Sequence, residues 1–181
     1  MKLGLVLSGG GIRGVAHVGV IKALEENGIK PEVLAGTSAG SIVAALYSMG
    51  YTPEEMLEMF KKFTKTAVGI TPRYLFANIR ENGGIKVRGM ISGVNLENLI
   101  QEFAIKKSIS KIIDIKTPIA IVSTDLITGE KIIFTNSKEA KEDYYIKNIE
   151  VGKAVRASSS VPGVYTPLEI RKLPVCRWRI K

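Results

Sequence analysis

The stretch Val33-Leu34-Ala35-Gly36-Thr37-Ser38-Ala39-Gly40 decides the fold of this chain, because it joins a short apolar run to a Gly-x-Ser-x-Gly turn. The apolar segment Ser41–Tyr47 follows at once. This order predicts a strand, a sharp turn and a helix. A serine at the apex of such a turn lifts its hydroxyl clear of the sheet, and the flanking glycines permit the bend. Ser38 is therefore the candidate catalytic nucleophile, within a turn formed by Gly36, Thr37, Ala39 and Gly40. An isolated match of this kind also fits a plain glycine-rich turn, but the strand before it and the helix after it favour the nucleophile.

A second glycine-rich turn lies upstream, after the apolar run Leu3–Leu7. The segment that follows it has apolar residues at helical spacing and ends at Asn27-Gly28, a typical helix stop. Strand, loop, helix and the strand of the serine turn make a βαβ unit. The chain is therefore predicted to be an α/β protein with a mainly parallel sheet and helices on its faces.

Two mechanisms fit the glycine loop Ser8–Gly14. Its spacing Gly9-x-Gly11-x-x-Gly14 matches a dinucleotide fingerprint, which also needs an acidic residue near the end of the second strand. The nearest acid, Glu32, precedes that strand instead. The favoured alternative is an oxyanion hole, in which backbone amides point at the oxygen that becomes negative during acyl transfer. Its candidate residues are Gly9, Gly10, Gly11, Ile12, Arg13 and Gly14.

Composition excludes several classes of protein. The 181 residues, 45% of them hydrophobic, fit one globular domain, and no apolar run is long enough for a membrane span or a secretory signal, which predicts a cytoplasmic protein. A single cysteine, Cys176, and a single histidine, His17, argue against a disulfide and a metal site, and no cofactor is expected. The net charge of +9 includes five basic residues in segment 171–181, and residues 1–170 carry 21 basic against 17 acidic residues. The body of the chain is only mildly basic, so nucleic acid is not an expected partner.

The rest of the chain predicts further elements. Thr52-Pro53-Glu54-Glu55 is a capping box that begins a helix whose Met and Phe stripe is expected in the core, with an acyl-binding pocket as the alternative. Segment 65–93 is basic and rich in glycine, and is interpreted as a connecting or lid-like region. Further helices are expected over 94–105 and 152–158, and strands over 118–124 and 131–134, the last two joined by a turn at Thr128-Gly129-Glu130.

Four motifs make the chain resemble the patatin-like phospholipase family, in particular its small bacterial members. They are Gly9–Gly14, Gly36–Gly40, the stretch Ser123–Gly129, and Ala154-Val155-Arg156-Ala157-Ser158-Ser159-Ser160-Val161-Pro162-Gly163. The resemblance implies a three-layer α/β/α sandwich and hydrolysis of lipid acyl esters by a Ser-Asp dyad. It makes Ser38 the nucleophile and the Gly10, Gly11 and Ile12 amides the oxyanion hole. It also implies a lipid or acyl-ester substrate and peripheral contact with a membrane.

The family's aspartate is the one part of the pattern that does not match. Members place it in an Asp-Gly-Gly or Asp-Gly-Ala motif shortly after the segment that here ends at Ile170, whereas no aspartate follows Asp143. We therefore expect an incomplete domain over 1–170, an atypical basic tail over 171–181 and an impaired hydrolase. The alternative is a catalytically inactive protein that binds acyl chains or anionic membrane surfaces. Asp114, Asp125 and Asp143 are possible substitutes, and Asp125 is interpreted as a local turn former.

His17 is the only histidine available as a catalytic base. It precedes Ser38 in the chain, whereas the histidine of a Ser-His-Asp triad in α/β-hydrolases follows the serine. We therefore interpret His17 as a structural residue of the helix after the glycine loop.

Overall fold

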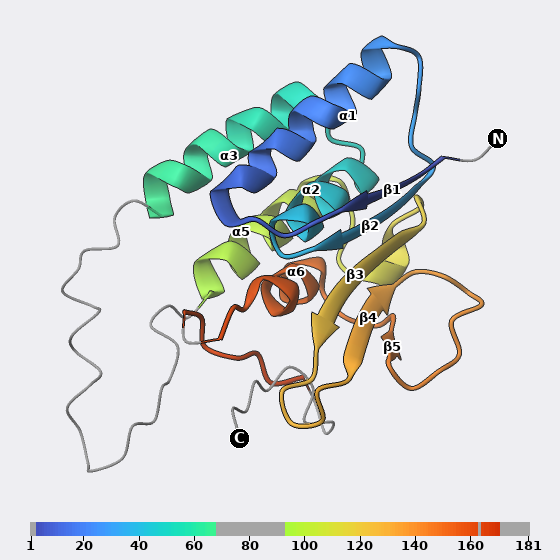
Figure 1. The fold of residues 1–181 in the computed structure, drawn as a ribbon, viewed down its shortest axis with the longest axis vertical. Helices are drawn as coiled ribbons and strands as arrows, with labels where there is room; N and C mark the ends of the chain where they lie inside the picture. Colours follow the sequence, from blue (N-terminus) through green and yellow to red (C-terminus); the bar gives the residue numbers. More distant parts are fainter. Residues whose placement is uncertain (1–2, 68–92, 163, 171–181) are drawn as a thin grey trace.

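The sheet of this protein has five strands in the order β1-β2-β3-β4-β5. In the computed structural model, which describes residues 3–67, 93–162 and 164–170, they are β1 (Gly4–Leu7), β2 (Val33–Thr37), β3 (Ile119–Thr124), β4 (Lys131–Thr135) and β5 (Tyr145–Ile146). β1, β2 and β3 run parallel, β4 is antiparallel to β3, and β5 is parallel to β4. The mixed α/β class with a mainly parallel sheet is thereby confirmed (Figure 1).

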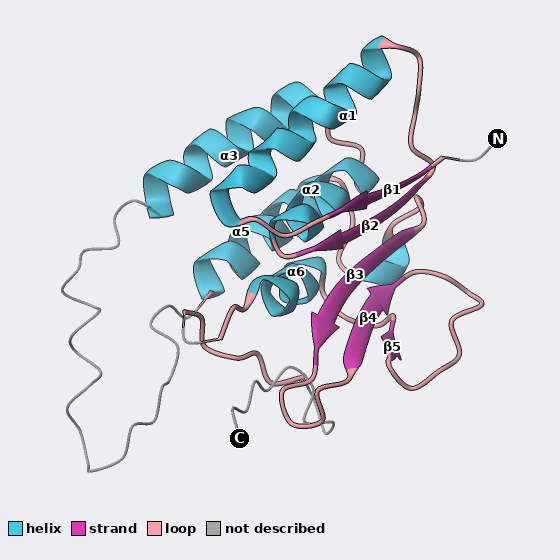
Figure 2. Ribbon diagram, in the orientation of Figure 1, coloured by secondary structure: helices cyan, strands magenta, loops and turns pink. Residues whose placement is uncertain are grey.

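The helices gather around one face of the sheet (Figure 2). They are η1 (Gly11–Val15), α1 (Ala16–Glu26), α2 (Ala39–Ser48), α3 (Pro53–Ala67), α5 (Val94–Lys106), η2 (Ile112–Asp114) and α6 (Val151–Ser159). α2 lies against β2 and neighbours α6, which packs on β3 and on α5. α1 and α3 lie side by side on the outer side of α2 (Figure 1). The serine helix α2 is therefore the centre of the helical layer.

Alternation along the strands decides which side chains enter the core. Leu34 and Ile121 are completely buried beneath α2 and α6, whereas Val6 on the opposite face of the sheet is 79% exposed. A strand points successive side chains to opposite faces, so one face carries the core. Nine of the ten residues of α2 are buried. The sheet therefore supports a buried helix directly behind the turn that carries Ser38.

The helix ends agree with the prediction where a capping box or a stop residue marks them. The capping box is present, because the Thr52 amide donates to Glu55 Oε2 at 2.8 Å and the Glu55 amide donates to Thr52 Oγ1 at 3.2 Å. Gly50 has a φ of 84° just after α2, and Asn27 caps α1. The Met and Phe stripe of α3 is core, since Met56 and Phe60 are buried.

One predicted boundary needs correction, one strand was not expected, and two predicted segments lie wholly or partly outside the described residues. The connecting region predicted over 65–93 begins later, because residues 65–67 continue α3; residues 68–92 lie outside the described residues. Strand β5 was not expected, because two residues are too few for a period-2 pattern. The tail 171–181 also lies outside the described residues.

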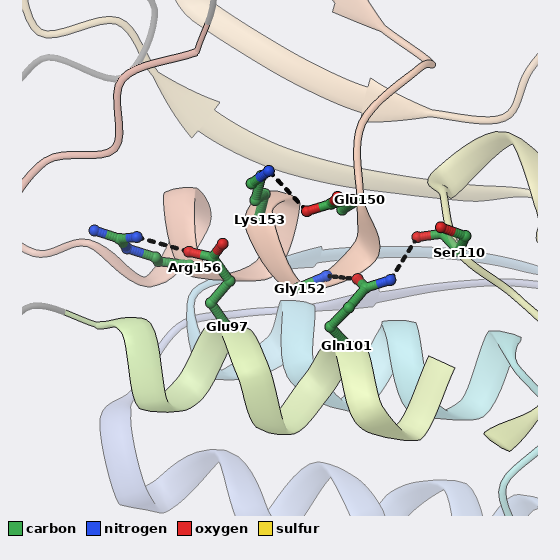
Figure 3. A network of polar contacts seen from close by, with 7 residues as sticks. All are labelled: Glu97, Gln101, Ser110, Glu150, Gly152, Lys153 and Arg156. Carbon is green, nitrogen blue, oxygen red and sulfur yellow. Dashed lines mark hydrogen bonds and ion pairs between the residues drawn. The ribbon is translucent and has the colours of Figure 1, made fainter. Parts of the chain in front are cut away.

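Helix α6 is held on α5 by a close backbone approach and a set of polar contacts (Figure 3). Gly152 lies against the Glu97 carbonyl oxygen, where a Cβ would collide. The Gly152 amide donates to Gln101 Oε1 at 3.0 Å, and Gln101 Nε2 donates to the Ser110 carbonyl at 2.9 Å. Arg156 pairs with Glu97 at 2.6 Å, and both side chains are largely buried. These contacts fix the position of α6 beside the carboxyl edge of the sheet.

Candidate active site

Ser38 occupies the turn between β2 and α2 in a strained conformation, with φ 50° and ψ −123°. These angles resemble the first central position of a type II′ turn, which favours glycine. A serine keeps them only where its surroundings fix the backbone. The Ser38 carbonyl accepts the Ser41 amide at 2.9 Å and Ser41 Oγ at 2.6 Å. The structure thus places Ser38 at the apex predicted from the sequence.

The two glycines of the turn allow strand and helix to lie backbone against backbone. A Cβ on Gly36 would collide with the Gly40 carbonyl oxygen, and a Cβ on Gly40 would collide with the Leu7 carbonyl oxygen and lie 2.7 Å from that of Ser8. Thr37 Oγ1 donates to the Val122 carbonyl at 3.2 Å. These glycines are therefore required by packing.

Ala39 is buried at the start of α2 and meets the second glycine turn. A Cβ on Gly14 would collide with the Ala39 side chain. η1 and α2 therefore pack together closely, and the glycine loop and the serine turn form one unit.

The glycine loop lies directly beside Ser38. A Cβ on Gly9 would stand 3.2 Å from Ser38 Cβ and 3.8 Å from Ser38 Oγ. The loop follows β1 and the serine turn follows β2, and these parallel neighbours bring their carboxyl ends to one edge of the sheet. The two glycine turns are therefore neighbours at the carboxyl edge of the sheet.

The backbone of this loop leaves several amides unused. Gly11 has a φ of 58° and opens η1, while the Arg13 amide donates to the Gly10 carbonyl at 3.2 Å. Within the described residues, the amides of Gly10, Gly11 and Ile12 donate no hydrogen bond. Gly9 through Arg13 are exposed, and only Gly14 is buried. Three free amides thus stand in an accessible loop next to Ser38.

One contact at this site was not predicted from the sequence, and it is made by Ser158 of α6. The Ser38 amide donates to Ser158 Oγ at 2.9 Å, and Ser158 Oγ donates to the Val122 carbonyl at 2.6 Å. Ser158 lies in the last of the four motifs, 120 residues beyond Ser38. No local sequence pattern predicts the contact between Ser38 and Ser158, because only the folded chain brings α6 to the serine turn.

Comparison with known proteins identifies the family of this chain. Residues 5–176 match the family described as patatin-like phospholipase. The chain belongs to this family. It is 29% identical over 170 residues to the uncharacterized protein YqhO of Bacillus subtilis, a match that covers 92% of this chain and 58% of that protein. It is 30% identical over 167 residues to the uncharacterized NTE family protein MT2641 of Mycobacterium tuberculosis, covering 92% and 24% of the two chains.

A shorter and more similar segment matches lysophospholipases. Over 61 residues the chain is 52% identical to the lysophospholipase NTE1 of Kluyveromyces lactis, covering 34% of this chain and 4% of that protein. The chain spans less than two thirds of the length of each of these curated relatives.

Solved structures show the same fold. The type III effector protein ExoU aligns with a TM-score of 0.59 and 20% identity, covering 90% of this chain and 41% of ExoU. VipD from Legionella pneumophila aligns with a TM-score of 0.58 and 16% identity, covering 94% and 44%. The patatin-like fold is therefore shared at low sequence identity.

None of the aspartates in the described residues is hydrogen-bonded to the Ser38 hydroxyl, as a catalytic base for this serine would be. Asp125 is buried, and its Oδ1 accepts the amide of Ile127 at 2.7 Å, which makes it a turn former as predicted. Asp114 Oδ2 accepts the Lys111 amide at 2.8 Å, and Asp143 is exposed. Within the described residues, no hydrogen bond links Ser38 Oγ to a carboxylate or a histidine.

His17 contacts the backbone at the start of the glycine loop. Its Nε2 lies 2.9 Å from the Ser8 carbonyl oxygen, which can only accept, so this ring nitrogen carries the proton. The contact ties the first turn of α1 to the start of the glycine loop. This contact supports the interpretation of His17 as a structural residue of α1.

Neither a metal site nor a membrane span is found in the part of the chain that the structure describes. No three side chains of His, Cys, Asp or Glu gather there as metal ligands would, and no helix there combines the length and apolarity needed to cross a bilayer. An apolar cavity of about 20 Å³ lies between α2, α3 and α5, lined by residues that include Ile42, Met59 and Phe103. It has room for about one water molecule.

Proposed function

We propose that this protein is a serine acyl hydrolase of the phospholipase A or esterase type, with Ser38 as its nucleophile. The observation that carries the proposal is the position of Ser38 at a strained turn, beside a loop whose Gly10, Gly11 and Ile12 amides are unused. Such amides stabilise the oxygen that becomes negative in acyl transfer, and removing one donor typically costs about 3 kcal/mol of transition-state stabilisation. The dinucleotide alternative lacks its acidic residue.

The reaction runs in two steps. Ser38 Oγ attacks the ester carbonyl carbon, its proton passes to a base, and the carbonyl oxygen becomes negative facing the loop amides. The C–O bond to the alcohol breaks as the alcohol oxygen takes up a proton, which leaves the acyl group on Ser38. Water then attacks the acyl carbon, and the fatty acid and the free serine are released. The substrate class is a lipid acyl ester, supported by the patatin-like family and by the lysophospholipase relatives.

The aspartate motif that supplies the base in the family is not present in this sequence, which predicts slow hydrolysis. By family resemblance the base is an aspartate, but two of the chain's three aspartates bind local backbone amides and the third, Asp143, is exposed. General-base assistance is typically worth about 10² to 10⁴ in rate. We therefore propose that the chain as given hydrolyses esters slowly. Replacing segment 171–181 by a continuation that contains Asp-Gly-Gly should raise turnover of a p-nitrophenyl ester. Equal turnover of both proteins, lost in Ser38→Ala, would mean that another group serves as the base.

The direct test is active-site labelling. A fluorophosphonate probe should label Ser38 of the intact protein, and Ser38→Ala should lose the label while it keeps the same circular dichroism spectrum and thermal midpoint within a few degrees. Label on another serine, such as Ser8 or Ser158, would refute the assignment. Ser158 itself should carry no label, because its hydroxyl is already engaged by the Ser38 amide and the Val122 carbonyl.

A second candidate function follows from the missing base: a protein that binds lipid surfaces without turning over esters. Its partner would be an acyl chain or an anionic membrane contacted from one side. Co-sedimentation with vesicles containing anionic phospholipid, without release of fatty acid and without probe labelling, is the result that would favour this candidate over the hydrolase.

A further inference from the structure

Ser158 lies in a motif that the proposed chemistry leaves without a role. Its hydroxyl has two partners of fixed chemistry, because the Ser38 amide can only donate and the Val122 carbonyl can only accept. The oxygen of Ser158 therefore receives the Ser38 N–H, and its proton points to Val122. A hydroxyl used in both directions has no proton to give to a substrate, so Ser158 can act only through Ser38.

The two hydrogen bonds of Ser158 lie where a further backbone hydrogen bond between β2 and β3 would be expected. The Leu34 amide donates to the Pro118 carbonyl at 2.9 Å, and Leu34 is paired with Ile119 in this parallel register. Bonds of a parallel ladder recur every second residue. The hydrogen bond two such steps beyond Leu34 would run from the Ser38 amide to the Val122 carbonyl. Ser158 Oγ lies between these two groups and forms a hydrogen bond with each of them.

This insertion coincides with the point where β2 leaves the sheet. Ser38 departs from strand geometry here, with φ 50° and ψ −123°, and its carbonyl is already bound by Ser41. The Ser158 bridge fixes the amide on the other side of the same residue. A strained residue persists only when its surroundings over-determine it. The bridge and Ser41 together supply that constraint from both sides of Ser38.

Helix α6 is placed firmly enough to carry such a contact. Gly152 and Arg156 lock it to α5 through Gln101 and Glu97 (Figure 3). Ser123 Oγ on β3 also donates to the Ala157 carbonyl at 3.1 Å, one residue before Ser158. Contacts of α6 with α5 and with β3 therefore independently position the Ser158 hydroxyl where β2 and β3 separate.

We propose that Ser158 is a positioning residue for the nucleophile: its hydroxyl replaces the last β2–β3 ladder bond and thereby holds Ser38 in the strained conformation that exposes Oγ. This inference rests on the proposed function, in which Ser38 is the nucleophile. Without the hydroxyl, the Ser38 amide loses its partner, and the turn relaxes to angles that aim Oγ elsewhere.

The test compares Ser158→Thr with Ser158→Val, which have the same shape and differ in the hydroxyl. The Val variant should label with the fluorophosphonate at least about tenfold more slowly than the Thr variant, because a small misplacement of reacting atoms costs up to about 10²-fold. Ser160→Ala is the matched control, since Ser160 Oγ donates only to the Arg156 carbonyl at 2.7 Å within its own helix turn. It should label at the parent rate. In a parent protein that labels, equal rates for Thr and Val, whether fast or slow, would overturn the proposal.

A second readout does not depend on catalysis. Hydrogen exchange of the Ser38 amide, followed by NMR and referenced to the Leu34 amide in the core, should be at least about tenfold faster in Ser158→Val than in Ser158→Thr, because the exchanging amide has lost its acceptor. If no variant and not even the parent labels, the proposed function fails, and this exchange ratio alone decides on the bridge. Equal exchange in both variants would overturn it. Should Ser158→Val not fold, Ser158→Ala takes its place.

Discussion

The two glycine turns at the carboxyl edge of the sheet have similar composition and opposite physical roles. In the serine turn, Gly36 and Gly40 are buried, and an added Cβ would meet backbone atoms that cannot move aside. In the loop after β1, Gly11 is exposed, has a φ of 58° and faces open space. Glycine is required in the first turn for close packing and in the second for backbone conformation. A glycine in a motif therefore does not by itself tell whether it serves folding or chemistry.

This difference separates stability from reactivity within one site. Substitution in the packed turn should unfold the protein, and substitution of Gly11 in the open loop should leave it folded with altered reactivity at Ser38. The predictions below follow that contrast, from the largest expected effect to the smallest.

Gly40→Ala should have the largest effect. The new Cβ would collide with the Leu7 carbonyl and lie 2.7 Å from the Ser8 carbonyl. Backbone atoms of a strand cannot yield cheaply, so we expect a loss of about 3 kcal/mol or more in the free energy of unfolding. Urea denaturation followed by circular dichroism measures it. Gly19→Ala in α1, where nothing lies within 4 Å, is the control and should gain roughly 0.5–1 kcal/mol. A folded Gly40→Ala protein of parent stability would contradict the packing role.

Gly11→Val should remove probe labelling while the protein stays folded. The side chain has space, but the positive φ costs about 1–2 kcal/mol and turns the neighbouring amides away from Ser38. The matched control is Gly28→Val, which has a φ of 72° and open space at the other end of α1. It should lose similar stability and label normally. Parent-like labelling of Gly11→Val would exclude the loop as an oxyanion hole.

Ser38→Gly should be more stable than the parent by about 1 kcal/mol, because it relieves a strained serine backbone. Ser38→Ala should not show this gain, since alanine keeps the Cβ that makes these angles unfavourable. Thermal unfolding of the three proteins at one protein concentration gives the comparison. Equal stability of the Gly and Ala variants would mean that the turn stores no strain.

His17→Ala should have the smallest effect. It removes the contact between Nε2 and the Ser8 carbonyl, a hydrogen bond worth about 0.5–1.5 kcal/mol. We expect a loss at the lower end of that range and labelling of Ser38 within a few-fold of the parent rate. Complete loss of labelling in a folded His17→Ala protein would indicate that His17 takes part in the chemistry.

Local sequence determined a large part of this structure. The turn at Ser38, the capping box at Thr52 and the stop at Asn27 were predicted because their geometry depends on residues only a few positions apart. The parallel arrangement of β1 and β2 followed as well, since a βαβ unit has one favoured handedness. These features require no knowledge of distant contacts.

Tertiary structure alone decided the rest. The bridge from Ser158 to Ser38 joins residues 120 positions apart, and it exists because α5 and β3 together set the position of α6. The serines at 158, 159 and 160 look alike in sequence, yet only Ser158 reaches the serine turn. Which of them does so depends on the rotation of one helix, and packing against distant elements fixes that rotation. The sequence by itself thus determined where a nucleophile can stand, whereas the assembled fold decided what holds it there.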